Sequence, residues 1–143
     1  MTITCTRKII FDAGHRIVSH ENSCKFLHGH RYIIEATFQA KQIDSVGRVI
    51  DFGVIKEKLG SWVMQNLDHT LILWDQDAEL ANSVQNITGQ KIYLLKTNPT
   101  AENIAAHLLN DICPMLFDKT QVWCVKIKLH ESENNYAEVV QSV

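Results

Sequence analysis

Several features that define specialised classes of protein are missing from this sequence. No apolar stretch approaches the length that spans a bilayer, and residues 1–8 lack the apolar core of a signal peptide. No run of lysine or arginine stands out, and the formal net charge is −2, so neither nucleic acid nor a membrane surface is expected as a main partner. The four cysteines form no CxxC pair and no disulfide framework. This usage favours reduced thiols and a cytoplasmic location. We also find no repeat, linker or low-complexity tract.

The remaining composition is that of an ordinary globular chain. Of its 143 residues, 45% are hydrophobic, which is enough for a single domain over 1–143 with a buried core. Three of the cysteines are expected to be small buried residues of that core: Cys5, Cys113 and Cys124.

The spacing of apolar residues predicts an α+β fold. Segments with alternating apolar residues are predicted strands: 3–11, 31–40, 91–95, 121–129 and 136–140. Helical spacing predicts an amphipathic helix over 54–67, capped by Asp51, and a weaker helix over 78–84. A third helix is predicted to start at Asn98-Pro99-Thr100 and to stop at Pro114. Residues 12–27 are expected to be irregular.

His15, His28 and His30 lie within 16 positions, together with Cys24. His28 and His30 are two residues apart at the start of a β-like run, so on a strand their imidazoles share one face. His15 arrives from the preceding strand and can supply a third nitrogen. Three neutral imidazoles with an open fourth position are the ligand set of a catalytic zinc site. The alternative is a closed structural site with Cys24 as fourth ligand. The histidines without such a pattern are expected to be ordinary core or surface residues: His20, His107 and His130.

Residues suited to acid–base chemistry accompany this group. A thiol close to a cation has a lowered pKa, so Cys24, four residues before His28, can act as base or nucleophile. In Asp68-His69 a carboxylate precedes an imidazole that can move protons; the alternative is a helix end followed by a polar turn. Glu131 continues the parity of Trp123, Val125, Ile127 and Leu129 and is expected to face a pocket. It either orients another group or anchors a ligand with two parallel N–H donors.

Together these motifs resemble the 6-pyruvoyltetrahydropterin synthase and 6-carboxytetrahydropterin synthase family. The resemblance implies the tunnelling fold, in which β-β-α-α-β-β subunits with an antiparallel sheet and helices on one face form a barrel around a tunnel. It also implies a homo-oligomer with the active site between subunits. Compared with the family pattern, residues 75–96 are a small insertion of one helix and one strand. The matching motifs run in order over nearly the whole chain: Phe11-x-Ala13-x-His15, Cys24-x-x-x-His28-Gly29-His30, Gly47-Arg48-Val49-Ile50-Asp51-Phe52, Leu67-Asp68-His69, Asn98-Pro99-Thr100-Ala101-Glu102-Asn103 and Glu131.

The resemblance also implies roles for these residues. Zinc would be held by His15, His28 and His30 and would bind oxygens of the substrate's side chain. Cys24 would abstract a proton, and Asp68 and His69 would assist proton transfer. Glu131 would anchor the pterin and can also belong to the proton relay. Thr100 and Glu102 would bind the substrate.

The usual substrate of the family is 7,8-dihydroneopterin triphosphate. One branch eliminates triphosphate to give 6-pyruvoyltetrahydropterin, and the other also loses acetaldehyde to give 6-carboxytetrahydropterin on the route to queuosine. Three residues separate Cys24 from His28, as in the carboxy enzymes. The resemblance therefore favours a zinc-dependent lyase of the carboxy type. The alternative is a non-catalytic, zinc-stabilised pterin-binding module, in which Cys24 would be a metal ligand.

Overall fold

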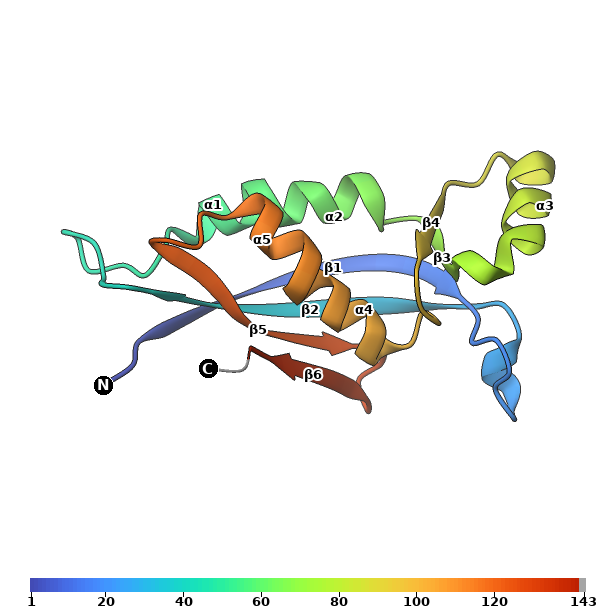
Figure 1. Cartoon of the computed structure of the whole chain (residues 1–143), viewed down its shortest axis with the longest axis horizontal. Coiled ribbons are helices and arrows are strands. Elements are labelled where there is room, and N and C mark those ends of the chain that lie inside the picture. Colours follow the sequence, from blue (N-terminus) through green and yellow to red (C-terminus); the bar gives the residue numbers. More distant parts are fainter. Residues whose placement is uncertain (142–143) are drawn as a thin grey trace.

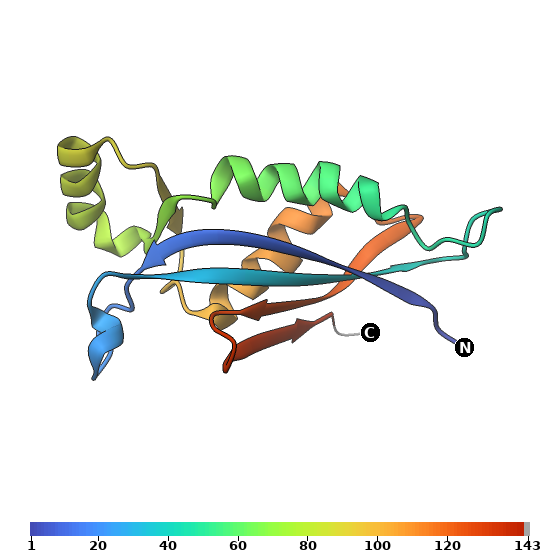
Figure 2. The same cartoon turned by 180° about the vertical axis from the view of Figure 1, so that it is seen from behind.

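A computed structural model describes residues 1–141 of the chain. Six strands form one sheet in the order β4-β3-β1-β2-β5-β6, with the long pair β1–β2 at its centre (Figures 1 and 2). The strands are β1 (Thr4–His15), β2 (His28–Ala40), β3 (Thr70–Trp74), β4 (Ile92–Leu95), β5 (Val122–His130) and β6 (Tyr136–Val140). Two long helices cover one face of this sheet, and α3 (Ala78–Thr88) stands beyond its end (Figures 1 and 2).

Each long helix contains a π turn. The first consists of α1 (Phe52–Ile55), the π turn Lys56–Gly60 and α2 (Ser61–Asn66). The second consists of α4 (Ala101–His107), the π turn Leu108–Ile112 and α5 (Cys113–Leu116). The predicted stop at Pro114 is wrong. Because the π turn already breaks the regular hydrogen-bond ladder, the missing N–H of Pro114 is tolerated and the helix continues.

Side-chain caps begin both long helices, as expected. The Asp51 carboxylate accepts a hydrogen bond from the Gly53 backbone N–H at 2.7 Å, and the Thr100 hydroxyl accepts one from the Asn103 N–H at 3.1 Å. Short 3₁₀ turns lie at Ser23–Lys25 and Asp75–Asp77. None of the helices in residues 1–141 has the length and apolar character needed to cross a bilayer.

The core lies between the sheet and the long helices. Burying each large apolar side chain stabilises the fold by roughly 1.5–3 kcal/mol. The predicted inward face of β2 is confirmed: Tyr32, Ile34, Ala36 and Phe38 have no exposed surface. Both predicted helix faces are buried through Ile55, Leu59, Val63, Ile104, Ala105 and Leu108. No disulfide joins the four cysteines; Cys113 and Cys124 are buried as predicted, and Cys5 is half-buried.

Strands β1 and β2 are longer than predicted. Their antiparallel register runs without interruption from Thr4 opposite Gln39 to His15 opposite His28. The strand predicted over 3–11 therefore continues through His15, and the strand predicted over 31–40 starts at His28. The irregular excursion is confined to the connection between them, so all three candidate metal ligands lie on paired strands.

A β-bulge changes the predicted parity of β5. Thr37 pairs with Lys126 whereas Phe38 pairs with Cys124, so Val125 is an extra residue in β5. The prediction that Trp123 and Val125 share the inward face of Ile127 is therefore wrong, and Cys124 is buried instead.

The sheet is antiparallel over β1, β2, β5 and β6, as expected, but β3 and β4 add two parallel strands at one edge, of which β4 belongs to residues 75–96. β3, which the sequence did not predict, pairs with Ala13–His15 of β1 and with β4. The helix predicted over 78–84 extends to Thr88 and ends at Gly89, whose φ of +71° is readily adopted by glycine.

Candidate active site

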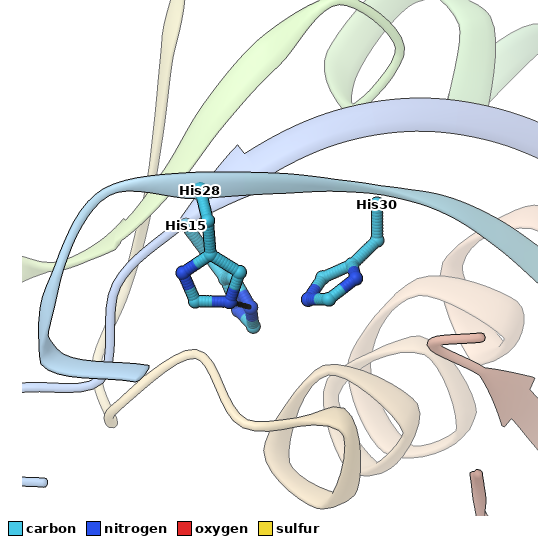
Figure 3. Close-up of side chains that lie close together, drawn as sticks. All are labelled: His15, His28 and His30. Atoms are coloured by element: carbon cyan, nitrogen blue, oxygen red, sulfur yellow. Dashed lines mark hydrogen bonds between the residues drawn. The ribbon is translucent and has the colours of Figure 1, made fainter. Parts of the chain in front are cut away.

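The three histidines meet on the helix-covered face of the sheet (Figure 3). His15 ends β1 opposite His28, and His30 lies two residues further along β2. One nitrogen of each imidazole lies within 4.8 Å of the others. Burial lowers the pKa of His15 to about 4 and also lowers the pKa of His30. Both imidazoles are therefore neutral near pH 7, which is the form that binds a metal.

Backbone carbonyls determine which nitrogens face the centre of this group. The Nδ1 of His15 lies 2.8 Å from the Pro99 carbonyl oxygen, and the Nδ1 of His28 lies 2.7 Å from that of Phe26. A carbonyl oxygen can only accept, so both Nδ1 atoms carry the proton and both Nε2 atoms present lone pairs in the neutral rings. These Nε2 atoms are 3.0 Å apart, a contact that a shared cation satisfies (Figure 3).

The third imidazole, that of His30, also has a nitrogen that a cation would satisfy. The Nε2 of His30 is buried and has no hydrogen-bond partner within residues 1–141. Three converging imidazole nitrogens, two of them on rings fixed by carbonyl hydrogen bonds, fit a divalent metal such as Zn²⁺.

A pocket of about 300 Å³ opens beside the histidines and contains four of the predicted site residues. Glu131 lies between the pocket and the three histidines: its Oε1 is 3.5 Å from the His30 Nε2, and its Oε2 is 4.0 Å from the His15 Nε2. The predicted residues that line the pocket are Cys24, Thr100, Glu102 and Glu131.

Cys24 lies on the 3₁₀ turn between β1 and β2 and is half-buried. In the described chain, the group of potential ligand atoms within 4.8 Å of one another contains three histidines and no cysteine. Cys24 is therefore not grouped with the three histidines in this structure and lines the pocket beside them.

The Asp68–His69 pair lies elsewhere. The Asp68 Oδ2 is 2.8 Å from the His69 Nδ1, and this hydrogen bond raises the pKa of His69. The Asp68 Oδ1 accepts from the Asp12 backbone N–H at 3.0 Å. His69 lines a shallow depression together with Asp12 and Arg31. Asp12 alternates along β1 with the inward residues, so this imidazole opens on the opposite face of the sheet. Within one chain, the sheet separates His69 from Cys24.

The model of the 6-pyruvoyl tetrahydropterin synthase family matches residues 4–142. The chain belongs to this family. The resemblance seen in the sequence motifs is thereby confirmed. The chain is 53% identical over 137 residues to the 6-carboxy-5,6,7,8-tetrahydropterin synthase of Rickettsia bellii, covering 96% of this chain and 99% of that protein. It is 26% identical to the 6-pyruvoyl tetrahydrobiopterin synthase of Dictyostelium discoideum, covering 94% and 93% of the two chains.

Solved structures show the same fold at low sequence identity. An uncharacterized protein from Wolinella succinogenes superposes with a TM-score of 0.77 at 19% identity, covering 99% of both chains. The 6-pyruvoyl tetrahydropterin synthase of Caenorhabditis elegans superposes with a TM-score of 0.70 at 20% identity, covering 99% of this chain and 97% of that one. The predicted tunnelling fold of the 6-pyruvoyl tetrahydropterin synthase family is thus confirmed.

Several residues that shape the site in this family member were missed by sequence reasoning. Pro99 and Phe26 act through backbone carbonyls, which have no side-chain signature. Asn98 holds the Pro99 segment against the loop after β1, because its side chain accepts from the Val18 N–H at 2.9 Å and donates to the Val18 carbonyl at 2.8 Å. Tyr32 was predicted as core, but its buried hydroxyl has no partner within residues 1–141.

Proposed function

We propose that the protein is a zinc-dependent lyase of the 6-carboxytetrahydropterin synthase type. It would convert 7,8-dihydroneopterin triphosphate to 6-carboxy-5,6,7,8-tetrahydropterin with loss of acetaldehyde and triphosphate, a step towards queuosine. The observation that carries the proposal is that Cys24 and Glu131 line one pocket against three histidines whose Nε2 atoms converge. The 53% identity to a relative named as the carboxy enzyme supports this product over the pyruvoyl pterin.

Each group at the site has a separate role in the proposed reaction. Zinc bound by the three histidines would supply a Lewis acid for the oxygens of the substrate's side chain. The Glu131 carboxylate accepts two parallel hydrogen bonds from the pterin's amino group and ring N–H, which fixes the ring in the pocket. The Cys24 thiolate then takes a proton from the side-chain carbon held beside it.

The start of α4 completes the binding surface. The Thr100 oxygen is occupied in accepting the Asn103 N–H, so its hydroxyl proton remains available to donate to the substrate. Glu102 lines the same pocket and presents carboxylate oxygens that accept from polar groups of the ligand.

We further propose that neighbouring copies of the chain complete each active site. The Asp68–His69 pair faces away from its own pocket, so proton transfer by His69 requires the pocket of another copy. β3 pairs with β1 only at Ala13–His15, and β6 ends the sheet, so the described strands leave edges on which a second copy can pair. Each copy would act as one cytoplasmic domain on a small molecule, with no nucleic acid or membrane partner.

Identification of the products tests this function. Zinc-loaded protein is incubated with 7,8-dihydroneopterin triphosphate, and the pterin, acetaldehyde and triphosphate are identified by mass spectrometry. We expect 6-carboxytetrahydropterin with both other products. The pyruvoyl pterin without acetaldehyde would instead assign the chain to the other branch. Binding of a pterin without any turnover by the zinc-loaded protein would contradict the lyase and favour the binding module.

A further inference from the structure

The insertion of residues 75–96 contacts the body of the protein at His69. Gln90 follows Gly89, the end of α3, and precedes β4. Its side-chain Nε2 donates a hydrogen bond of 2.5 Å to the backbone carbonyl of His69. The next residue, Lys91, accepts from the Leu71 N–H through its carbonyl at 3.1 Å. The Gln90 side chain therefore extends the hydrogen bonding between β3 and β4 as far as His69.

His69 needs such support because its backbone is unfavourable. Its φ of +58° lies in the left-handed region, which residues with a Cβ rarely adopt. Its N–H donates to the Asp12 carbonyl at 2.7 Å, and its own carbonyl accepts from Gln90. One backbone group is thus held by β1 and the other by the insertion.

The same conformation orients the imidazole. The Nδ1 of His69 faces the Asp68 carboxylate at 2.8 Å and carries the proton of that hydrogen bond. The Nε2 is left as the group that exchanges protons, on a side chain that is 78% exposed. If the His69 backbone relaxed to a right-handed conformation, the imidazole would leave Asp68.

The insertion is firmly attached, as a positioning element must be. Arg16, directly after His15, donates from Nε to the Asp77 Oδ2 at 2.7 Å and from Nη2 to the Oδ1 at 2.5 Å, and Asp77 is buried. On β4, the Tyr93 hydroxyl lies 2.6 Å from the His107 Nε2 of α4. Helix α3 itself stands away from the sheet (Figures 1 and 2), so these contacts attach the insertion near its ends.

We propose that Gln90 is a positioning residue, through which the insertion holds His69 in the left-handed conformation that aligns its imidazole with Asp68. The inference rests on the proposed role of His69 in proton transfer. The charged groups around His69 are Asp68, Asp12 and Arg31. None of them contacts the His69 carbonyl, so Gln90 acts on the backbone alone.

The test replaces Gln90 by methionine, which has a similar length but no donor. Gln85→Met on the exposed part of α3 is the matched control. NMR titration of the His69 imidazole should give a pKa that falls towards the ordinary 6.5 in Gln90→Met and stays raised in Gln85→Met. Because a small misplacement of a catalytic group lowers turnover, kcat should fall about tenfold in Gln90→Met while KM changes less than about twofold. Gln90→Lys restores a donor and should recover part of kcat.

Two outcomes separate this inference from the proposed function. An unchanged His69 pKa and an unchanged kcat in Gln90→Met would overturn the role of Gln90 and leave the lyase proposal intact. If His69→Ala retains full turnover, the proposed role of His69 fails. The NMR titration and the backbone coupling constant of His69, which reports φ, would still decide whether Gln90 holds the residue. Both are measured without substrate, so a variant with weak activity is still informative.

Discussion

The glutamate-to-glutamine exchange at position 131 tests the pocket with the least structural disturbance. Glutamine keeps the shape of the side chain but replaces one acceptor oxygen by an NH₂ group. In the proposed complex that NH₂ group would meet an N–H of the pterin, so one hydrogen bond is lost and two donors face each other. Binding of the pterin should therefore weaken.

The structure sets the size of this loss. Removing a charged hydrogen-bond partner in a desolvated site costs about 2–4 kcal/mol, or roughly 30- to 1000-fold in affinity. The Glu131 side chain is 26% exposed, so solvent offsets part of the penalty. We expect a loss near the lower end, about 2 kcal/mol or about 30-fold in Kd.

Zinc content should not fall in the same variant. The negative charge of Glu131 favours the protonated form of His30 and so acts against the burial that lowers the pKa of this residue. Removing that charge lowers the His30 pKa further, which favours the neutral ligand form.

The assay is a fluorescence titration with a pterin, combined with metal analysis of the same samples. Glu133→Gln, two residues away on the exposed turn, is the matched control and should bind like the wild type. Wild-type affinity in Glu131→Gln would refute the anchoring role. Loss of zinc in that variant would contradict this prediction and mean that Glu131 is a metal ligand.

Two further predictions concern the metal and the proton-transfer pair. His28→Ala or His30→Ala should lower zinc content sharply, because the two remaining imidazoles make a poor metal site. Cys24→Ala should retain zinc and lose turnover, and loss of metal from this variant would favour the closed site with a cysteine ligand. Asp68→Asn should lower the pKa of His69 towards its ordinary value, measured by NMR. Since the folded-state pKa of His69 is raised, the stability that this contact adds is fully present below pH 6.5 and is lost as pH rises through the folded-state pKa. A variant with an unchanged His69 pKa would show that the contact is not formed.

Local patterns in the sequence predicted most of β1 and β2, but not the ends of these strands, where the three histidines lie. Alternation along β2 predicted the buried face, and the two-residue spacing of His28 and His30 predicted that their imidazoles share it. The order of the motifs predicted the family and its fold. These features depend only on residues close together in the chain, or on a pattern spread over all of it.

Features that depend on contacts between residues far apart in the sequence could not be predicted from these patterns. The bulge at Val125 is defined by its register with Thr37 and Phe38 on another strand. β3 forms because it pairs with the end of β1 and with β4, and neither partner is marked in its own sequence. The Pro99 carbonyl reaches His15 over a separation of 84 residues. The position of His69 on the far face of the sheet likewise follows from topology, not from its adjacency to Asp68.

The most direct test of the account asks whether one active site uses residues of two copies. Cys24→Ala and His69→Ala proteins, each expected to be inactive alone, are mixed, dissociated and reassembled with zinc, and turnover of 7,8-dihydroneopterin triphosphate is measured. Random reassembly should create sites with Cys24 from one copy and His69 from another, and about a quarter of wild-type activity should return. If the mixed oligomers stay inactive while wild-type protein treated identically recovers, the shared active site is contradicted.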